Sequence, residues 1–132
     1  MQSNIYLVDK LRPNYFVMNM NVTFGEYIRI KRKELNLPIR KVAAILDIDP
    51  STLSKIERGE RSVVRLFIPK LASLFNVQEN HLLIFYHSDK IAFSLINEDC
   101  SGEILKVAKE KINYLRSKNY IQSKIEFKEK HT

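Results

Sequence analysis

The side chains best suited to chemistry lie in one short polar segment near the middle of the chain. Ser51, Thr52 and Lys55 follow one another closely there. A lysine ammonium group can donate hydrogen bonds to O6 and N7 of guanine, and serine and threonine hydroxyl groups can hydrogen-bond to several bases. Pro50, just before them, has no backbone N–H and is not expected to read a base. The residue types therefore favour recognition of nucleic-acid bases.

Two short helices joined by a tight turn are predicted to position this segment. Apolar residues at the three- and four-residue spacing of a buried face indicate the first helix. They are Val42, Ala43, Ile45 and Leu46. Asp49 followed by Pro50, an acidic N-cap before a proline at the first helical position, predicts the start of the second helix. Leu53 and Ile56 would face inward, and Gly59 stands where a helix favours a left-handed C-terminal residue. This is the layout of a helix-turn-helix motif, whose second helix enters the major groove of DNA.

The sequence STLSKIERGER, residues 51–61, resembles the Cro/repressor-type (Xre-like) helix-turn-helix family. That family includes phage repressors, many bacterial regulators and the controllers of restriction–modification operons, and the last kind is an attractive subtype for this chain. The resemblance runs from about Thr23 to Leu83, and its most specific part is the I-E-x-G motif at residues 56–59. It implies an all-α fold, a five-helix repressor-like bundle, here with additional C-terminal helices.

The resemblance also implies an ion pair inside the domain. In the family, a basic residue at the position of Arg32 pairs with the glutamate of the motif, here Glu57, and would lock the first helix to the recognition helix. The alternative is two exposed charges. The chain departs from the family at Asp47, which replaces the usual turn glycine but tolerates left-handed geometry better than most residues. It departs again at Pro38 and Ile39, which replace a polar residue and a glutamine, so the phosphate contact often made by that glutamine is not expected.

Basic residues are concentrated in two stretches of the chain. Residues 22–65 carry ten Lys/Arg against six Asp/Glu, a net +4, and residues 101–132 carry eight against four, again +4. Residues 66–100 carry two against four, a net −2. The excess on the predicted motif suits a phosphate backbone. Phosphate contacts, which give affinity and register but no sequence information, are expected from Arg29, Arg40, Lys41, Arg58, Arg61, Ser62 and Arg65.

Local signals predict the other helices of the domain. Thr23 and Glu26 have the spacing of a capping box, which starts a helix that runs to about Leu35. Arg65 opens a later helix that Asn76 ends, and residues 77–83 resemble the last helix of the family core. The expected core residues of the first and the later helix are Phe24, Tyr27, Ile28, Leu35, Leu66, Ile68, Leu71, Ala72, Leu74 and Phe75.

Four segments are predicted. Residues 1–21 are an N-terminal extension or a docking arm, and residues 22–86 are the helix-turn-helix DNA-binding domain. Residues 87–118 are a C-terminal helical dimerisation element, and residues 119–132 are a polar basic tail.

The helical segment after residue 83 is expected to be interrupted near His87 and Ser88. Asp99 is the expected N-cap of the next segment, a helix from Glu103 to about Ser117. One apolar face of this helix needs a partner, and its residues are Ile104, Leu105, Ala108, Ile112 and Leu115. The partner is either the chain's own core or the same helix on a second chain. We favour the second chain, because the family core already closes on itself and a two-fold operator suits a symmetric dimer.

Several classes of protein are disfavoured. The single cysteine, Cys100, excludes an internal disulfide and a cysteine-based zinc site, and we expect neither a metal nor a cofactor. No apolar run is long enough to cross a membrane, and the N-terminus lacks the order of a signal peptide, so a cytoplasmic protein is expected. The sequence has no glycine-rich phosphate loop, no clustered metal ligands and no nucleophile motif, so we do not expect an enzyme.

The sequence therefore predicts a sequence-specific DNA-binding transcriptional regulator. It would bind double-stranded operator DNA as a homodimer, with a recognition helix of each chain in the major groove. The alternative is an antitoxin, which would autoregulate its operon and bind a toxin, a partner protein from the same operon, through the C-terminal helices.

Overall fold

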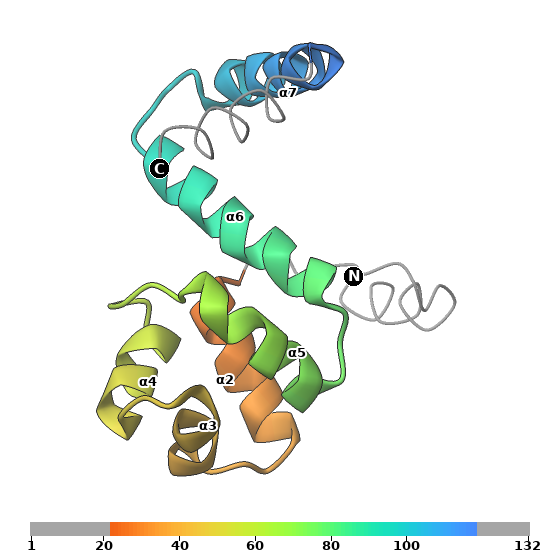
Figure 1. Cartoon of the computed structure of the whole chain (residues 1–132). Helices are drawn as coiled ribbons and strands as arrows, with labels where there is room; N and C mark the ends of the chain where they lie inside the picture. Colours follow the sequence, from red (N-terminus) through yellow and green to blue (C-terminus); the bar gives the residue numbers. More distant parts are fainter. Residues whose placement is uncertain (1–21, 119–132) are drawn as a thin grey trace, which may run out of the picture. The chain divides into compact units, whose positions relative to one another are not determined.

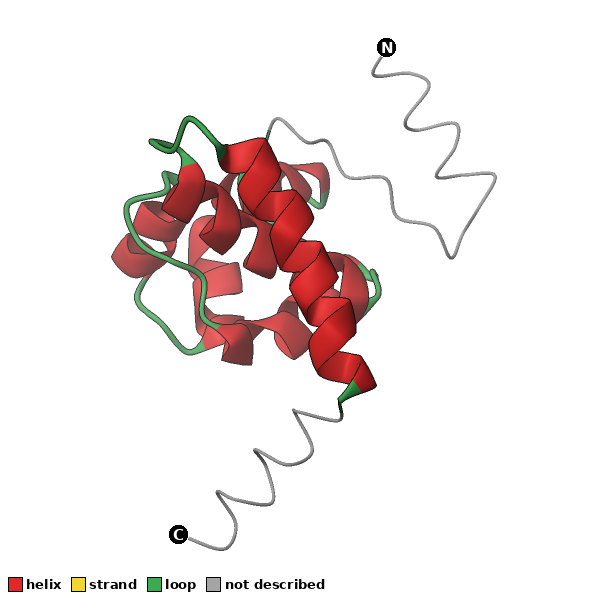
Figure 2. Ribbon diagram, turned by 90° about the horizontal axis from the view of Figure 1, so that it is seen from above, coloured by secondary structure: helices red, strands yellow, loops and turns green. Residues whose placement is uncertain are grey.

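The structure, a computed structural model, describes residues 22–118, and every regular element in that range is a helix (Figures 1 and 2). The elements are α2 (Phe24–Glu34), α3 (Ile39–Leu46), α4 (Pro50–Glu57), the 3-10 turn η1 (Arg65–Phe67), α5 (Ile68–Phe75), α6 (Glu79–Leu95) and α7 (Ser101–Ser117). The predicted all-α fold with additional C-terminal helices is confirmed. The segments predicted as an N-terminal arm and a basic tail, 1–21 and 119–132, lie outside the described residues.

The described chain divides into two compact units within α6. The first unit ends at Ala92 and the second begins at Phe93. The first therefore contains α2 to α5 and most of α6, and the second contains the end of α6 and all of α7.

Hydrogen bonds at the start of α2 anchor the first unit. The predicted capping box is confirmed: Thr23 Oγ1 accepts from the Glu26 N–H at 3.2 Å, and the Thr23 N–H donates to Glu26 Oε2 at 3.4 Å. The Phe24 N–H donates to Asp89 Oδ2, on α6, at 2.9 Å. The first N–H groups of a helix have no partner within the helix. Asp89 therefore supplies a tertiary cap that ties α6 to the first turn of α2.

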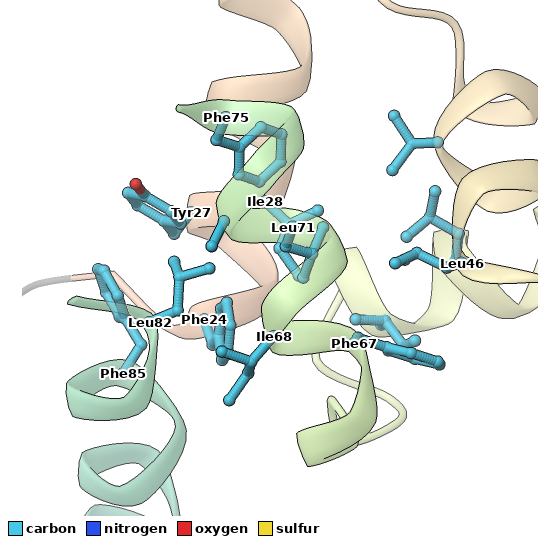
Figure 3. Packing of buried hydrophobic residues seen from close by; sticks show 14 of the residues in the cluster. Phe24, Tyr27, Ile28, Leu46, Phe67, Ile68, Leu71, Phe75, Leu82 and Phe85 are labelled. Atoms are coloured by element: carbon cyan, nitrogen blue, oxygen red, sulfur yellow. The ribbon is translucent and has the colours of Figure 1, made fainter. Parts of the chain in front are cut away.

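Aromatic side chains from α2, α5 and α6 form one end of the core (Figure 3). The ring centroids of Tyr27 and Phe85 lie 4.5 Å apart, and those of Phe24 and Phe85 lie 5.7 Å apart in a stacked pair. Phe75 meets the edge of Tyr27 at 6.2 Å. Aromatic pairs at such separations add to the stabilisation that comes from buried area. Phe85 and the fully buried Leu82 thus close the bundle with the N-terminal half of α6.

Three residues predicted in the core are instead exposed: Leu35 by 46%, Ile45 by 41% and Leu66 by 76%. Leu35 lies one residue beyond α2, where the helical face ends. Ile45 points roughly 100° away from the mean direction of the buried residues of α3, because successive helical residues are about 100° apart. Leu66 lies in η1, whose tighter winding buries Phe67 and turns Leu66 outward.

Two local predictions near the C-terminal helices are also wrong. α6 runs through His87 and Ser88 without a break. The Ser88 Oγ donates to the Phe85 carbonyl at 3.3 Å, and the neighbouring Asp89 receives the Phe24 N–H, so these polar residues are accommodated within the helix. The N-cap of α7 is Cys100 and not Asp99, and α7 starts two residues before the predicted Glu103.

Gly25 permits the close approach of α2 to α4. A Cβ atom at this position would overlap the backbone carbonyl oxygen of Ile56. That oxygen belongs to a helix and cannot move aside without shifting the turn it belongs to. The two helices therefore pack at a distance that only glycine allows.

We expect Gly25→Ala to destabilise the protein by about 2–3 kcal/mol, because the new methyl group forces α2 away from α4. The matched control is Gly102→Ala in α7, since a Cβ atom there meets nothing within 4 Å. Gly102→Ala should leave the stability of the protein unchanged or raise it by up to about 1 kcal/mol, because alanine favours a helix more than glycine does. Urea unfolding followed by circular dichroism measures both. Equal stability of Gly25→Ala and the wild type would mean that the close approach does not constrain the fold.

Asp89 makes stability depend on pH. Burial raises the pKa of Asp89, the hydrogen bond from the Phe24 N–H opposes this shift, and the charge of Glu26 adds to it. The folded protein therefore holds this proton more tightly than the unfolded chain. Ionisation of Asp89 thus lowers the folding stability as the pH rises through the folded pKa, and this penalty is absent below the ordinary pKa of 3.8.

Asp89→Asn keeps an oxygen acceptor for the Phe24 N–H but removes the charge. We expect its stability relative to the wild type to increase between about pH 4 and about pH 7. Asp89→Ala loses the acceptor and should cost about 1 kcal/mol near pH 4. Its cost should be smaller near pH 7, by the amount that Asp89→Asn gains, because both variants remove the ionisation of Asp89. Urea unfolding at each pH tests this. A constant difference between Asp89→Asn and the wild type would show that ionisation of Asp89 is not linked to folding.

Candidate nucleic-acid interface

The helix α4 has one buried face and one face that is exposed to solvent. Leu53, Ile56 and Glu57 are buried. Ser51 and Lys55 are exposed on the opposite side. Thr52, the third residue predicted to read bases, is half-buried between the two faces. Two of the three predicted base-reading side chains therefore lie on the fully accessible face of one short helix, and the third lies at its margin.

The turn before α4 fixes its start. Asp47 has φ 57° and ψ 46°, so aspartate occupies the left-handed position where the family usually has glycine. The Asp47 and Ile48 N–H groups donate to the carbonyls of Ala44 and Ala43 at 3.1 and 3.0 Å and end α3. At the other end of α4, Gly59 has φ +78°, as predicted.

Asp49 is the N-cap residue of α4 and Pro50 opens the helix, as predicted. The Asp49 side chain, however, makes no capping hydrogen bond. The first-turn N–H groups of α4 therefore receive no oxygen from that side chain. A helix N-terminus with unsatisfied N–H groups favours a phosphate oxygen.

Arg32 and Glu57 form a bidentate ion pair between α2 and α4. Arg32 Nε donates to Glu57 Oε2 at 2.8 Å and Nη2 donates to Oε1 at 3.0 Å. Nη1 donates to the carbonyl of Leu37 at 3.0 Å. The side chains are 13% and 5% exposed. The hydrogen bonds to Glu57 raise the pKa of Arg32, so the arginine stays charged. The structure brings together the two residues for which the family resemblance implies a pair.

A second, exposed ion pair lies at the end of α4. Arg58 Nε and Nη2 donate to Glu60 Oε1 and Oε2, each at 3.1 Å. The hydrogen bond to Arg58 and its charge lower the pKa of Glu60, and the charge of Lys55 adds a smaller effect. Glu60 thus balances two cations predicted to contact DNA. No pattern in the sequence indicates this role of Glu60, because only the turn after α4 brings its side chain within reach of Arg58.

The other residues predicted to bind phosphates are all exposed, but they come from different elements. Arg29 lies on α2, and Arg40 and Lys41 lie in the first turn of α3. Arg61 and Ser62 lie in the loop after α4, and Arg65 opens η1. An accessible cation on a flexible stem can reach a phosphate without a fixed geometry. The arrangement therefore leaves each of these side chains available to a polyanion.

Comparison with known proteins agrees with this geometry. Residues 28–82 match the family described as HTH_3: Helix-turn-helix. These residues, which run from α2 to the start of α6, are similar to that family. Curated proteins yielded no match to the chain.

Within the matched residues, α3 and α4 occupy the positions of the two helices of a helix-turn-helix motif. Among residues 22–118, no three His, Cys, Asp or Glu side chains are placed to hold a metal ion. No helix within that range has the length and apolar character needed to cross a membrane.

The residues predicted to form a dimer lie on α7 of the second unit. Leu105, Ala108 and Ile112 are exposed, Ile104 and Leu115 are half-buried, and α7 has no buried residue. The five predicted residues therefore lie along one side of α7, and none of them is buried. Its role in dimerisation stays a prediction.

The Arg32–Glu57 pair predicts strong energetic coupling. Glu57→Ala should cost about 3 kcal/mol or more, because it leaves the arginine charge largely buried without a partner. Removing both charges should cost less than the two single losses added together, by about 1–3 kcal/mol. Urea unfolding of the four proteins gives the coupling energy. The exposed pair Arg58–Glu60 is the matched control and should show little coupling. Additive losses for Arg32 and Glu57 would mean that the pair does not hold α2 to α4.

Proposed function

We propose that this protein is a sequence-specific transcriptional regulator that binds double-stranded operator DNA. The observation that carries the proposal is the orientation of α4. Glu57 and Leu53 hold its buried face against the core, so Ser51 and Lys55 face solvent, and no element among residues 22–118 covers them. A rigid helix that presents polar side chains of suitable length fits the major groove. The exposed arginines and lysines of the same domain would hold the phosphates on either side.

The regulator would act as a homodimer. Two recognition helices would enter successive major grooves, roughly 34 Å apart, on an operator with two-fold symmetry. Exposed apolar side chains that could join two chains lie at Leu66 in η1 and along α7. Restriction–modification control is the subtype that we favour among regulators. We further propose a cytoplasmic protein without enzymatic activity.

An antitoxin role is the second candidate. One observation favours it: α7 buries none of its residues, although it carries a continuous apolar face. The helix-turn-helix domain would then autoregulate the operon while the C-terminal helices bind a toxin from the same operon.

Two variants separate base reading from phosphate binding. Lys55→Ala should weaken binding to an operator duplex selected from a random library by roughly 1–3 kcal/mol and relax the preference at one base pair. Arg61→Ala should weaken all duplexes alike and make the salt dependence shallower by about one unit of slope. Binding of each protein to the selected and to a scrambled duplex over a salt series measures both effects. An equal loss on the two duplexes for Lys55→Ala would contradict the base-reading role of α4.

A further inference from the structure

The helix α7 has a regular pattern of apolar and charged residues. Leu105, Ala108, Ile112 and Leu115 alternate at three- and four-residue spacing and form a seam along one side of the helix. This is the spacing of the a and d positions of a heptad repeat. The seam is accessible, with Leu105 and Ile112 each 48% exposed.

Both borders of this seam are basic. In the same heptad frame Lys109 and Arg116 occupy e positions, and Lys111 and Lys118 occupy g positions. All four side chains are exposed, and none of them takes part in an ion pair with another described residue. The acidic residues of α7, Glu103 and Glu110, lie at f positions on the opposite side of the helix. No negative charge on α7 therefore borders the seam.

This pattern is unfavourable for a pair formed by two copies of α7. A parallel pair would place Lys111 against Arg116 of the other copy, because g residues face e residues of the next heptad. An antiparallel pair would place Lys111 against Lys118 and Lys109 against Arg116. Each arrangement puts like charges across the interface, and residues at these positions decide partner choice in coiled coils.

We infer that α7 is a docking helix for a partner protein, and that its partner is an amphipathic helix with an apolar stripe bordered by glutamate or aspartate on both sides. Such a helix would cover the seam and pair each of the four cations with a carboxylate. The homodimer of the proposed function would then use another surface, such as the one around Leu66. The inference concerns the second unit alone and does not depend on DNA binding.

The protein itself supplies a suitable probe. The variant Lys109→Glu, Lys111→Glu, Arg116→Glu and Lys118→Glu, called here the acidic-border variant, keeps the seam and has the charges of the inferred partner. Cys100, the single cysteine of the chain, is exposed at the N-cap of α7 and allows donor and acceptor dyes to be attached at one site. Energy transfer between labelled chains then reports the pairing of α7 in the full-length protein.

Mixing the wild type with the acidic-border variant should give energy transfer at concentrations at least about tenfold lower than either protein alone. The effect should fall with added salt, because the paired charges are exposed. It should also disappear when Leu105 and Ile112 of the wild type are replaced by serine. The matched control replaces four other lysines by glutamate: Lys33, Lys70, Lys90 and Lys106. They are also exposed but lie away from the borders. It changes the net charge by the same amount and should not pair with the wild type through α7.

Four outcomes would overturn the inference. Energy transfer in the wild type alone that equals that of the mixture, and that is lost with the two serine substitutions, would assign the seam to a second copy of the chain. Pairing of the matched control would show that net charge, not the border positions, causes association. Energy transfer that arises only after removal of residues 119–132 would assign the seam to the chain's own tail. Binding of the wild type to phosphatidylglycerol vesicles that is lost with the two serine substitutions, without energy transfer in the mixture, would assign it to a membrane surface.

Discussion

The contact between α2 and α4 is the constraint on which the rest of the first unit depends. It has two parts. At Gly25 the backbones approach so closely that there is no room for a side chain. At Arg32 a bidentate ion pair holds Glu57, which is only 6% exposed. A buried carboxylate without a partner would be costly, so the fold is stable only while α2 stays in reach of α4.

This contact determines what α4 can offer to a ligand. Because Leu53, Ile56 and Glu57 are held inward, the rotation of the helix about its axis is fixed, and Ser51 and Lys55 must point outward. Preorganised side chains lose less freedom on binding. In the proposed function the exposed Arg58–Glu60 pair would have an opposing effect, because a phosphate that approaches Arg58 would compete with the Glu60 carboxylate. Such competition would lower the attraction for any duplex and leave relatively more weight on base contacts.

The two units differ in how much of their apolar surface is buried. In the first unit, Phe24 and Tyr27 of α2 pack against Phe85 of α6. In the second unit, α7 has an equally regular apolar side but no buried residue. The charges along its borders restrict which partner can cover it. The chain therefore combines a unit with a buried core and a helix, α7, with no buried residue.

Much of the first unit could be predicted from the sequence, because its signals are local. The capping box of Thr23 and Glu26, the proline at the start of α4 and the left-handed residues at Asp47, Gly59 and Asn76 depend on hydrogen bonds and backbone angles within a few residues. The buried stripes of α3 and α4 follow from helical periodicity. Through its resemblance to a known family, the motif at residues 56–59 also led to the Arg32–Glu57 pair.

Other features were decided by the tertiary structure alone. His87 and Ser88 suggested a break in α6, yet the helix continues because Asp89 finds its partner in Phe24, 65 residues earlier in the chain. Ile45 and Leu66 are apolar but exposed, since burial depends on which neighbouring element covers a face and not on residue type. The need for glycine at position 25 likewise comes from a carbonyl on another helix. Sequence patterns report the preferences of short segments, whereas these contacts arise only when distant segments pack together.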